Sequence, residues 1–247
     1  MQIIKDIFYK ADCALDVYLP DCEEFETIIY FHGGGLERGD KGGKAVRLGE
    51  DFAKAGYAFI SANYRLYPNA KFPDYLQDVA EAVAYAKKHF GGKKLYVGGS
   101  SAGAWLSMML CLRGEYLQAV GIENKEIDGW LIDSSQMTSH FNVQKMETGR
   151  DERLQRIDEF APLYYVDENM WFSKMLLVFY DNDMPCRYEQ NKLFYKSVLY
   201  FNEKADICYR VLSGKHCSGM SERDENGDYP LVKTTLDWLK GVREWKL

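Results

Sequence analysis

The sequence predicts an α/β fold in which a mostly parallel sheet is covered by helices on both faces. Three observations support this prediction. Strand-like and helix-like segments alternate along most of the chain, the strand candidates are short apolar runs, and glycine-rich turns follow two of them. Short apolar strands are typical of a sheet buried on both faces. At 247 residues the chain suits one such domain, residues 1–247, without room for a second large one.

The first half of the chain predicts four strands and two helices. The strand candidates are 2–9 and 13–19, which form an opening hairpin, then 27–31 and 57–62. Residues 43–55 carry apolar side chains at helical spacing, and this pattern stops at Gly56. A second helix is expected over 73–90, because Pro73 suits a first helical turn and two glycines follow Phe90.

The second half continues the alternation with one interruption. Strands are expected over 94–97, 129–132, 175–180 and 207–212, with helices over 102–113, 187–202 and 230–242. Residues 136–172 break the pattern, because aromatic and methionine side chains are scattered there among polar and charged ones. We interpret this stretch as a small lid inserted after a strand.

One of the glycine-rich turns contains a serine in a pattern typical of a catalytic nucleophile. Gly99, Ser101 and Gly103 fit Gly-x-Ser-x-Gly, between an expected strand and an expected helix. A sharp strand-to-helix turn lifts the serine Oγ off the backbone and needs small residues on either side. Ser100 is the competing candidate, but only Ser101 has a glycine both two residues before it and two residues after it.

A second glycine run follows the strand expected over 27–31 and reads His-Gly-Gly-Gly. Glycines at this point leave backbone N–H groups free to face an oxyanion. The expected donors are Gly34, Gly35 and Ala102, and Gly33 is the alternative within the glycine run. Ala102 begins the helix expected over 102–113, where the helix dipole also favours an anion. Two such motifs, in this order and each after a strand, predict an α/β-hydrolase.

A serine nucleophile needs a base, and histidine is the usual one. His216 follows the last expected strand, in a loop at the carboxyl end of the sheet where the active sites of such folds lie. The other three histidines are less suited, because His32 belongs to the glycine motif, His89 ends a surface helix and His140 lies in the interrupted segment. We therefore take His216 as the candidate base.

The acid that orients this base should lie between the serine and the histidine in the chain. Asp183 is favoured, because it stands on the turn after the strand expected over 175–180, two residues before Pro185. Asp181, at the end of that strand, and Asp133, after the preceding strand, are the alternatives. A turn-forming or helix-capping role is the ordinary function of the carboxylates that do not orient the base.

Composition excludes several classes of partner. The net charge of −6 argues against nucleic acid and anionic membranes, since either favours a basic surface. No stretch approaches the ~20 apolar residues of a membrane span, and the first residues lack the features of a secretory signal. None of the six cysteines forms a Cys-x-x-Cys pair, so we expect no zinc site. We also expect the cysteines to be reduced thiols, as in a cytoplasmic protein. The oligomeric state stays open.

The motifs together resemble those of α/β-hydrolase esterases related to hormone-sensitive lipase, especially compact acetyl and feruloyl esterases and kynurenine formamidases. The resembling pieces lie at residues 32–35, 63–68, 72–73, 78–79 and 99–103 and in the loops of Asp183 and His216. The resemblance spans roughly residues 15–240. It implies a triad of Ser101, His216 and Asp183, an oxyanion hole from the glycine motif and Ala102, no metal and no cofactor.

Two departures from this family bear on the substrate. Leu36 stands where an aromatic residue usually follows the glycines, which puts the shape of the acyl pocket in question. The short segment before residue 32 is too small for the N-terminal cap of hormone-sensitive-lipase relatives, so we expect an open site, roofed if at all by 136–172.

The expected function is serine-dependent hydrolysis of small carboxylic esters with short acyl groups, such as acetyl groups on sugars. The partner is then a small-molecule ester. Hydrolysis of a formamide such as N-formylkynurenine uses the same triad and is the first alternative. An inactive hydrolase fold that serves as a binding module is the second, and it is disfavoured because Ser101, His216 and Asp183 are all present.

Overall fold

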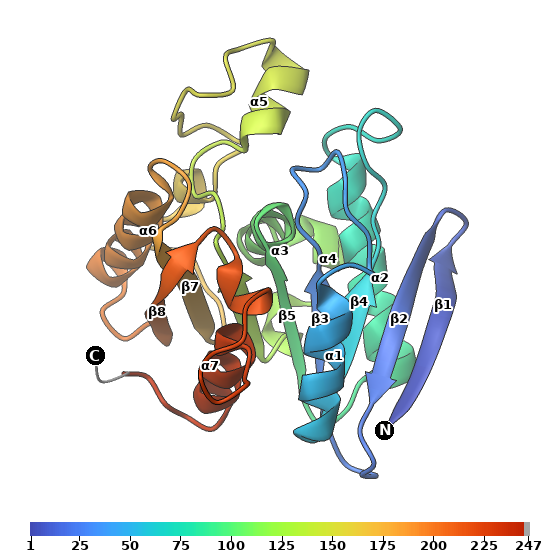
Figure 1. Cartoon of the computed structure of the whole chain (residues 1–247). Coiled ribbons are helices and arrows are strands. Elements are labelled where there is room, and N and C mark those ends of the chain that lie inside the picture. The colour runs from blue at the N-terminus through green and yellow to red at the C-terminus, as the bar shows by residue number, and fades with distance from the viewer. Residues whose placement is uncertain (245–247) are drawn as a thin grey trace.

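The computed structural model describes residues 1–244 and centres on an eight-stranded sheet (Figure 1). The strand order is β1-β2-β4-β3-β5-β6-β7-β8. The first strands, β1 (Gln2–Lys10) and β2 (Cys13–Leu19), form an antiparallel hairpin, and β2 also pairs antiparallel with β4 (Tyr57–Ala62). All other pairs are parallel, and they join β4 to β3 (Glu26–Phe31) and then β5 (Leu95–Ser100), β6 (Gly129–Asp133), β7 (Met175–Asn182) and β8 (Ile207–Lys215). The predicted α/β class with a mostly parallel sheet is confirmed.

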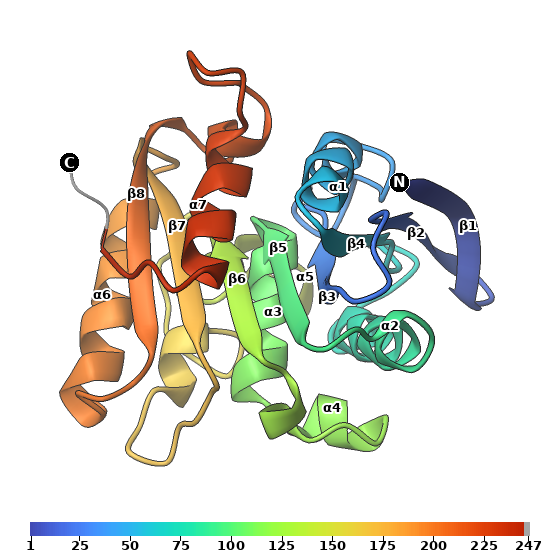
Figure 2. The same ribbon diagram turned by 90° about the horizontal axis from the view of Figure 1, so that it is seen from below.

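Helices cover both faces of the sheet (Figure 2). One face carries α1 (Ala45–Lys54) and α7 (Pro230–Leu239), and the other carries α2 (Asp74–Phe90), α3 (Ala102–Leu112) and α6 (Arg187–Phe201). Successive side chains of a strand therefore enter two different cores. In β3, Ile29 and Phe31 join the cluster under α2 and α3, whereas Ile28 and Tyr30 join the cluster under α1 and α7. This double burial explains why the central parallel strands are mostly apolar.

The predicted elements are present, with differences at their ends. Strand β5 continues through Gly98 and Gly99 to Ser100 instead of ending at residue 97. Glycine has a low strand propensity, so the sequence pattern does not indicate a strand at these two positions. The close pairing with β6 nevertheless requires glycine, because a Cβ on Gly98 would lie 2.4 Å from the carbonyl oxygen of Leu131. The closing helix ends at Leu239 rather than at residue 242, because Gly241 adopts a φ of +99°. A short helix, α4 (Glu115–Ala119), was not predicted.

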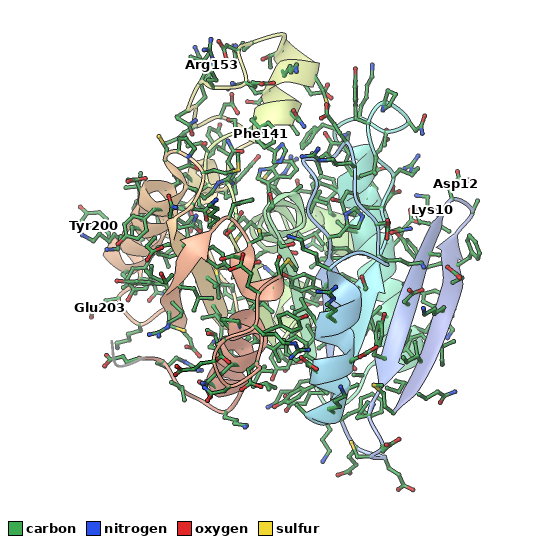
Figure 3. All side chains as sticks on the ribbon, in the orientation of Figure 1. Lys10, Asp12, Phe141, Arg153, Tyr200 and Glu203 are labelled. Carbon is green, nitrogen blue, oxygen red and sulfur yellow. The ribbon has the colours of Figure 1, made fainter. Side chains whose placement is uncertain are left out.

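The segment 136–172 is more ordered than its sequence indicates. It contains α5 (Phe141–Thr148) and a short 3₁₀ helix at Pro162–Tyr165. The helix α5 stands above the carboxyl edge of the sheet (Figure 1), and residues 134–140, which lead into it, are buried. In Figure 3, Phe141 lies at the end of α5 nearest the body of the molecule, and Arg153 lies at the outer tip of the segment.

Trp105 of α3 fixes the segment 136–172 from below. Its indole Nε1 donates a hydrogen bond to the carbonyl oxygen of Phe160 at 3.0 Å, and its ring is fully buried. Trp105, Met108 and Met109 of α3 are all completely buried in the core. Within residues 1–244, no helix combines the length and the apolar character needed to cross a membrane.

Candidate active site

Ser101 lies at the turn between β5 and α3 and has a strained backbone, with φ +53° and ψ −113°. Its N–H donates to the carbonyl oxygen of Asp133 at 2.8 Å. Both flanking glycines are needed because the chain passes itself closely at this turn. A Cβ on Gly103 would lie 2.0 Å from the carbonyl oxygen of Phe31, and one on Gly99 would lie 2.5 Å from the carbonyl carbon of Gly103. The turn therefore has the form that Gly-x-Ser-x-Gly indicates.

The three residues proposed as a triad lie together at the carboxyl edge of the sheet. His216, directly after β8, has its Nε2 2.9 Å from the Oγ of Ser101, although the two residues are 115 positions apart in the chain. The other ring nitrogen, Nδ1, is hydrogen-bonded to Oδ1 of Asp183 after β7. Because a carboxylate only accepts, Nδ1 carries the proton and Nε2 presents its lone pair to the serine hydroxyl.

The surroundings of Asp183 keep this carboxyl ionised. Burial alone would raise its pKa, but the hydrogen bond with His216 opposes this effect, together with bonds from the backbone N–H of Met184 at 2.7 Å and from Ser134 Oγ at 2.9 Å. The pKa of Asp183 is therefore below its ordinary value. An ionised acid can orient the imidazole and stabilise it when it takes up a proton.

Neither alternative acid contacts the histidine. Asp181 is exposed, and its Oδ1 accepts the backbone N–H of Gly214 at 2.9 Å. Asp133 is fully buried, and its Oδ1 accepts the hydroxyl of Tyr180 at 3.1 Å. Burial raises the pKa of Asp133 to about 8, so this side chain is protonated at neutral pH. An uncharged acid does not stabilise an imidazolium ion as a carboxylate does.

The remaining histidines have other surroundings. His89 is exposed on α2 and packs against Tyr85 in a tilted arrangement at a centroid distance of 4.3 Å. His140 is buried between the rings of Trp105 and Phe141, and burial lowers its pKa to about 3. His32 stacks on Tyr64 at 4.5 Å inside the glycine loop. None of these rings is hydrogen-bonded to Ser101 within the described part of the chain.

The glycine loop presents unbonded N–H groups near the serine. Gly34 and Gly35 adopt φ angles of +120° and +67°, which favour glycine, and a Cβ on Gly34 would lie 1.9 Å from the carbonyl oxygen of Arg38. In residues 1–244, the N–H groups of Gly34 and Gly35 have no acceptor. The N–H of Ala102 opens α3, where no earlier helical turn can accept it and the helix dipole adds positive character.

A pocket of about 690 Å³ opens at Ser101, a volume within the usual range for small-molecule sites. Apolar lining side chains are Phe141, Met184, Cys217 and Met220, and charged ones are Glu37, Arg38, Asp40 and Lys44. Leu36 stands where the family usually has an aromatic residue. It is buried in the core beneath α2 and α3 and is not among the residues that line the pocket. Phe141 of α5 borders the pocket together with the rings of Tyr30 and His32.

Three residues of this site were not found from the sequence: Ser134, Phe141 and Asn142. Ser134 directly follows β6, so its position at a strand end was a usable signal. Phe141 and Asn142 belong to a segment without periodicity, and nothing local marks them. The six cysteines are free thiols, and no group of three or more His, Cys, Asp or Glu side chains in the described residues could hold a metal ion.

The fold and this geometry are those of the α/β-hydrolases. Similar solved structures include esterase B of Lactobacillus rhamnosis inhibited by a C4-C4 SN3 tributyrin phosphonate, with a TM-score of 0.77 and 18% identity over 97% of this chain and 84% of that one. Residues 15–198 match the model of the BD-FAE family. The chain therefore belongs to the BD-FAE family of α/β-hydrolase esterases.

Curated relatives are similar over shorter stretches. The probable carboxylic ester hydrolase LipM of Mycobacterium tuberculosis is 35% identical over 112 residues, 43% of this chain and 25% of LipM. An acetyl esterase of Salmonella paratyphi B is 28% identical over 117 residues, 44% of this chain and 36% of that protein. The chain thus matches well under two thirds of the length of these relatives.

Proposed function

We propose that this chain is a carboxylic ester hydrolase in which Ser101 is the nucleophile, His216 the general base and Asp183 the residue that orients the base. The observation that carries the proposal is the continuous hydrogen-bonded series from Asp183 through His216 to Ser101, with 2.9 Å between His216 Nε2 and Ser101 Oγ. Membership of an esterase family supports the same activity.

In the first half-reaction Ser101 Oγ attacks the carbonyl carbon of the ester while His216 Nε2 takes the hydroxyl proton. The carbonyl oxygen becomes an oxyanion and accepts hydrogen bonds from Ala102 N–H and from the glycine loop, with Gly34 and Gly35 as the proposed donors. Collapse of this intermediate breaks the bond to the alcohol oxygen, which receives the proton from His216. An acyl-enzyme on Ser101 results.

In the second half-reaction a water molecule replaces the alcohol. His216 Nε2 removes a proton from this water as its oxygen attacks the acyl carbon, and the same N–H groups receive the second oxyanion. Collapse returns the proton to Ser101 Oγ and releases the carboxylic acid. Asp183 stays ionised throughout and stabilises the imidazolium ion in both half-reactions.

We propose short acyl groups and polar alcohols, including acetylated sugars, as the substrates. Phe141, Met184, Cys217 and Met220 form an apolar wall at Ser101, and the same pocket is bordered by four charged side chains from residues 37–44. A short acyl chain suits such a wall, and the hydroxyl groups of a polar alcohol can hydrogen-bond to the charged side chains. The name of the acetyl esterase relative supports this substrate class. In this proposal residues 136–172 roof the pocket.

Covalent labelling tests the proposal directly. A p-nitrophenyl alkylphosphonate should release one equivalent of p-nitrophenol and leave its phosphonyl group on Ser101, identified by mass spectrometry of the peptide. Ser101→Ala should abolish labelling and lower turnover by several orders of magnitude. Ser100→Ala is the matched control, which should still be labelled and should still hydrolyse the ester. Labelling of Ser100, or full turnover by Ser101→Ala, would contradict the assignment. N-formylkynurenine in the substrate panel separates esterase from formamidase activity.

A further inference from the structure

The carbonyl oxygens of Gly33, Gly34 and Gly35 all accept hydrogen bonds, and the donors differ for each of the three glycines. His32 Nδ1 bonds the oxygen of Gly33 at 2.7 Å. The backbone N–H groups of Glu37 and Arg38 bond the oxygen of Gly34 at 3.2 and 3.1 Å. The side-chain amide Nδ2 of Asn142 bonds the oxygen of Gly35 at 2.6 Å.

Holding a carbonyl oxygen also aims an N–H group. A trans peptide is planar, so the N–H of each residue points opposite to the carbonyl of the residue before it. The bond to Gly33 O therefore aims the N–H of Gly34, and the bonds to Gly34 O aim the N–H of Gly35. Burial lowers the pKa of His32, so its ring is neutral and the single proton lies on Nδ1, facing Gly33 O.

The third anchor differs from the first two because it comes from outside the loop. Asn142 belongs to the first turn of α5, and 107 positions separate it from Gly35. Its side chain is almost fully buried. The first turn of α5 packs closely against Gly35. A Cβ on Gly35 would lie 3.0 Å from Asn142 Nδ2 and 3.3 Å from Cζ of Phe141. Figure 3 shows Phe141 on the side of α5 that faces the body of the molecule.

The Asn142 bond restrains the one glycine of the three whose carbonyl oxygen is not hydrogen-bonded from within the glycine loop. Gly35 has no side chain and a φ of +67°, so no side-chain packing of its own restrains its ψ angle, and the hydrogen bond to its carbonyl oxygen helps to fix it. Rotation about ψ of Gly35 would change the course of the chain toward Leu36 and the turn at residues 37–38, whose N–H groups hold Gly34 O. Loss of the Asn142 bond would therefore disturb the orientation of the Gly35 N–H.

We propose that Asn142 is a positioning residue that fixes the glycine loop of the oxyanion hole from α5. The inference rests on the proposed function, in which Gly34 and Gly35 receive the oxyanion. In this view α5 is part of the active site as well as a cover over it. Donors that are aimed before the reaction need no reorientation in the transition state, so the benefit falls on kcat rather than on substrate binding.

Two variants of Asn142 test the proposal with p-nitrophenyl acetate. Asn142→Ala removes the donor, and Asn142→Asp keeps the shape while placing a carboxylate oxygen against Gly35 O. Removing a direct oxyanion donor typically lowers kcat about 10²- to 10³-fold. Displacing a donor should lower kcat by about 10- to 100-fold, with KM changed less than about twofold, and the rate of phosphonate labelling of Ser101 should fall in parallel. The acid limb of the pH profile should stay in place, because the triad is untouched.

Asn124→Asp is the matched control. Asn124 Nδ2 also donates to a backbone carbonyl, that of Cys111 at 2.7 Å, away from the pocket. This variant should keep kcat, and circular dichroism with thermal unfolding should show a folded protein for all three variants. Normal kcat in both folded Asn142 variants, or a rise in KM at constant kcat, would overturn the positioning role alone. A wild-type protein that neither hydrolyses esters nor reacts with the phosphonate would overturn the proposed function and this inference with it.

Discussion

Ser134 Oγ donates a hydrogen bond to Oδ2 of Asp183 at 2.9 Å from a backbone with a φ of +54°. A positive φ is unfavourable for a residue with a side chain, and such strain is concentrated at functional sites. Ser134 is fully buried, and its N–H bonds the carbonyl oxygen of Val178 on β7. The strained turn after β6 thus places a hydroxyl against the carboxylate oxygen that faces away from His216.

The first prediction concerns this hydroxyl. Ser134→Gly removes the donor and relieves the positive φ, so any loss of activity comes from the hydrogen bond rather than from backbone strain. A hydrogen bond to a charged group contributes about 1.5–3 kcal/mol, so we expect kcat/KM for p-nitrophenyl acetate to fall at least about tenfold. Ser135→Ala is the control, since Ser135 is equally buried and its hydroxyl donates to the carbonyl oxygen of Gln136 rather than to Asp183. Equal activity of Ser134→Gly and Ser135→Ala would show that the hydroxyl has no role.

The second prediction separates the two aspartates after β7. Asp183→Asn should lower kcat by about 10⁴-fold, because an amide can hold the imidazole in the wrong tautomer and cannot stabilise its charged form. Asp181→Asn should lower kcat only slightly, since Asp181 bonds the backbone of Gly214 and not the histidine. Steady-state kinetics of both folded variants give the answer. Similar, small losses in both would move the acid to another residue.

The third prediction concerns stability and pH. The pKa of Asp133 is about 8 in the folded protein, well above its ordinary value of 3.8. Between these values the folded state holds a proton that the unfolded state releases, so the contribution of this group is full below pH 4 and is lost as the pH rises toward 8. Asp133→Asn cannot ionise. Its free energy of unfolding, from urea denaturation, should therefore rise relative to wild type from pH 5 to pH 8 and level off above pH 8.

A constant difference between Asp133→Asn and wild type over that range would show that Asp133 titrates normally. Thr235→Val offers a comparison, because Thr235 is equally buried, bonds only the backbone of its own helix and does not titrate. Its stability difference from wild type should not depend on pH.

The fourth prediction concerns acyl-chain length. Because charged side chains from residues 37–44 border the same pocket as the apolar wall near Ser101, we expect kcat/KM to be highest for acetyl to butyryl p-nitrophenyl esters and to fall by octanoyl, below the micellar limit of each ester. A deep apolar channel would instead gain ~0.8 kcal/mol for each buried CH₂. Phe141→Ala should shift the optimum to longer chains, because it removes one of the aromatic side chains that border the pocket. A steady rise from butyryl to decanoyl in the wild type would contradict a short pocket.

The sequence predicts most of the fold because its signals are local. Apolar runs, helical spacing and terminal glycines each act within a few residues of one another. The serine turn is equally local, since the glycines at 99 and 103 and the serine between them fold back on one another. His216 and Asp183 could be chosen from chain order because parallel strands end at the same edge of the sheet.

Other features depend on contacts that no local pattern contains. Asn142 is an ordinary polar residue in an irregular stretch until α5 folds onto Gly35. The positive φ of Ser134 is imposed by pairing across β6 and β7, and serine is not a residue that suggests such a conformation. Asp183 and Asp133 lie at the ends of neighbouring strands, and only the folded contacts show that Asp183 is hydrogen-bonded to His216 whereas Asp133 is hydrogen-bonded to Tyr180.

The hydrogen-bonded site draws on the ends of five strands, from the glycine loop after β3 to His216 after β8. The serine turn lies in the first half of the chain and the histidine loop in the second, and the pairing of β7 with β8 brings the last partners together. Ester hydrolysis should therefore report complete assembly of the sheet, whereas circular dichroism also detects partly folded chains. A chromogenic ester would then serve as a sensor of native folding during refolding or after fragment complementation.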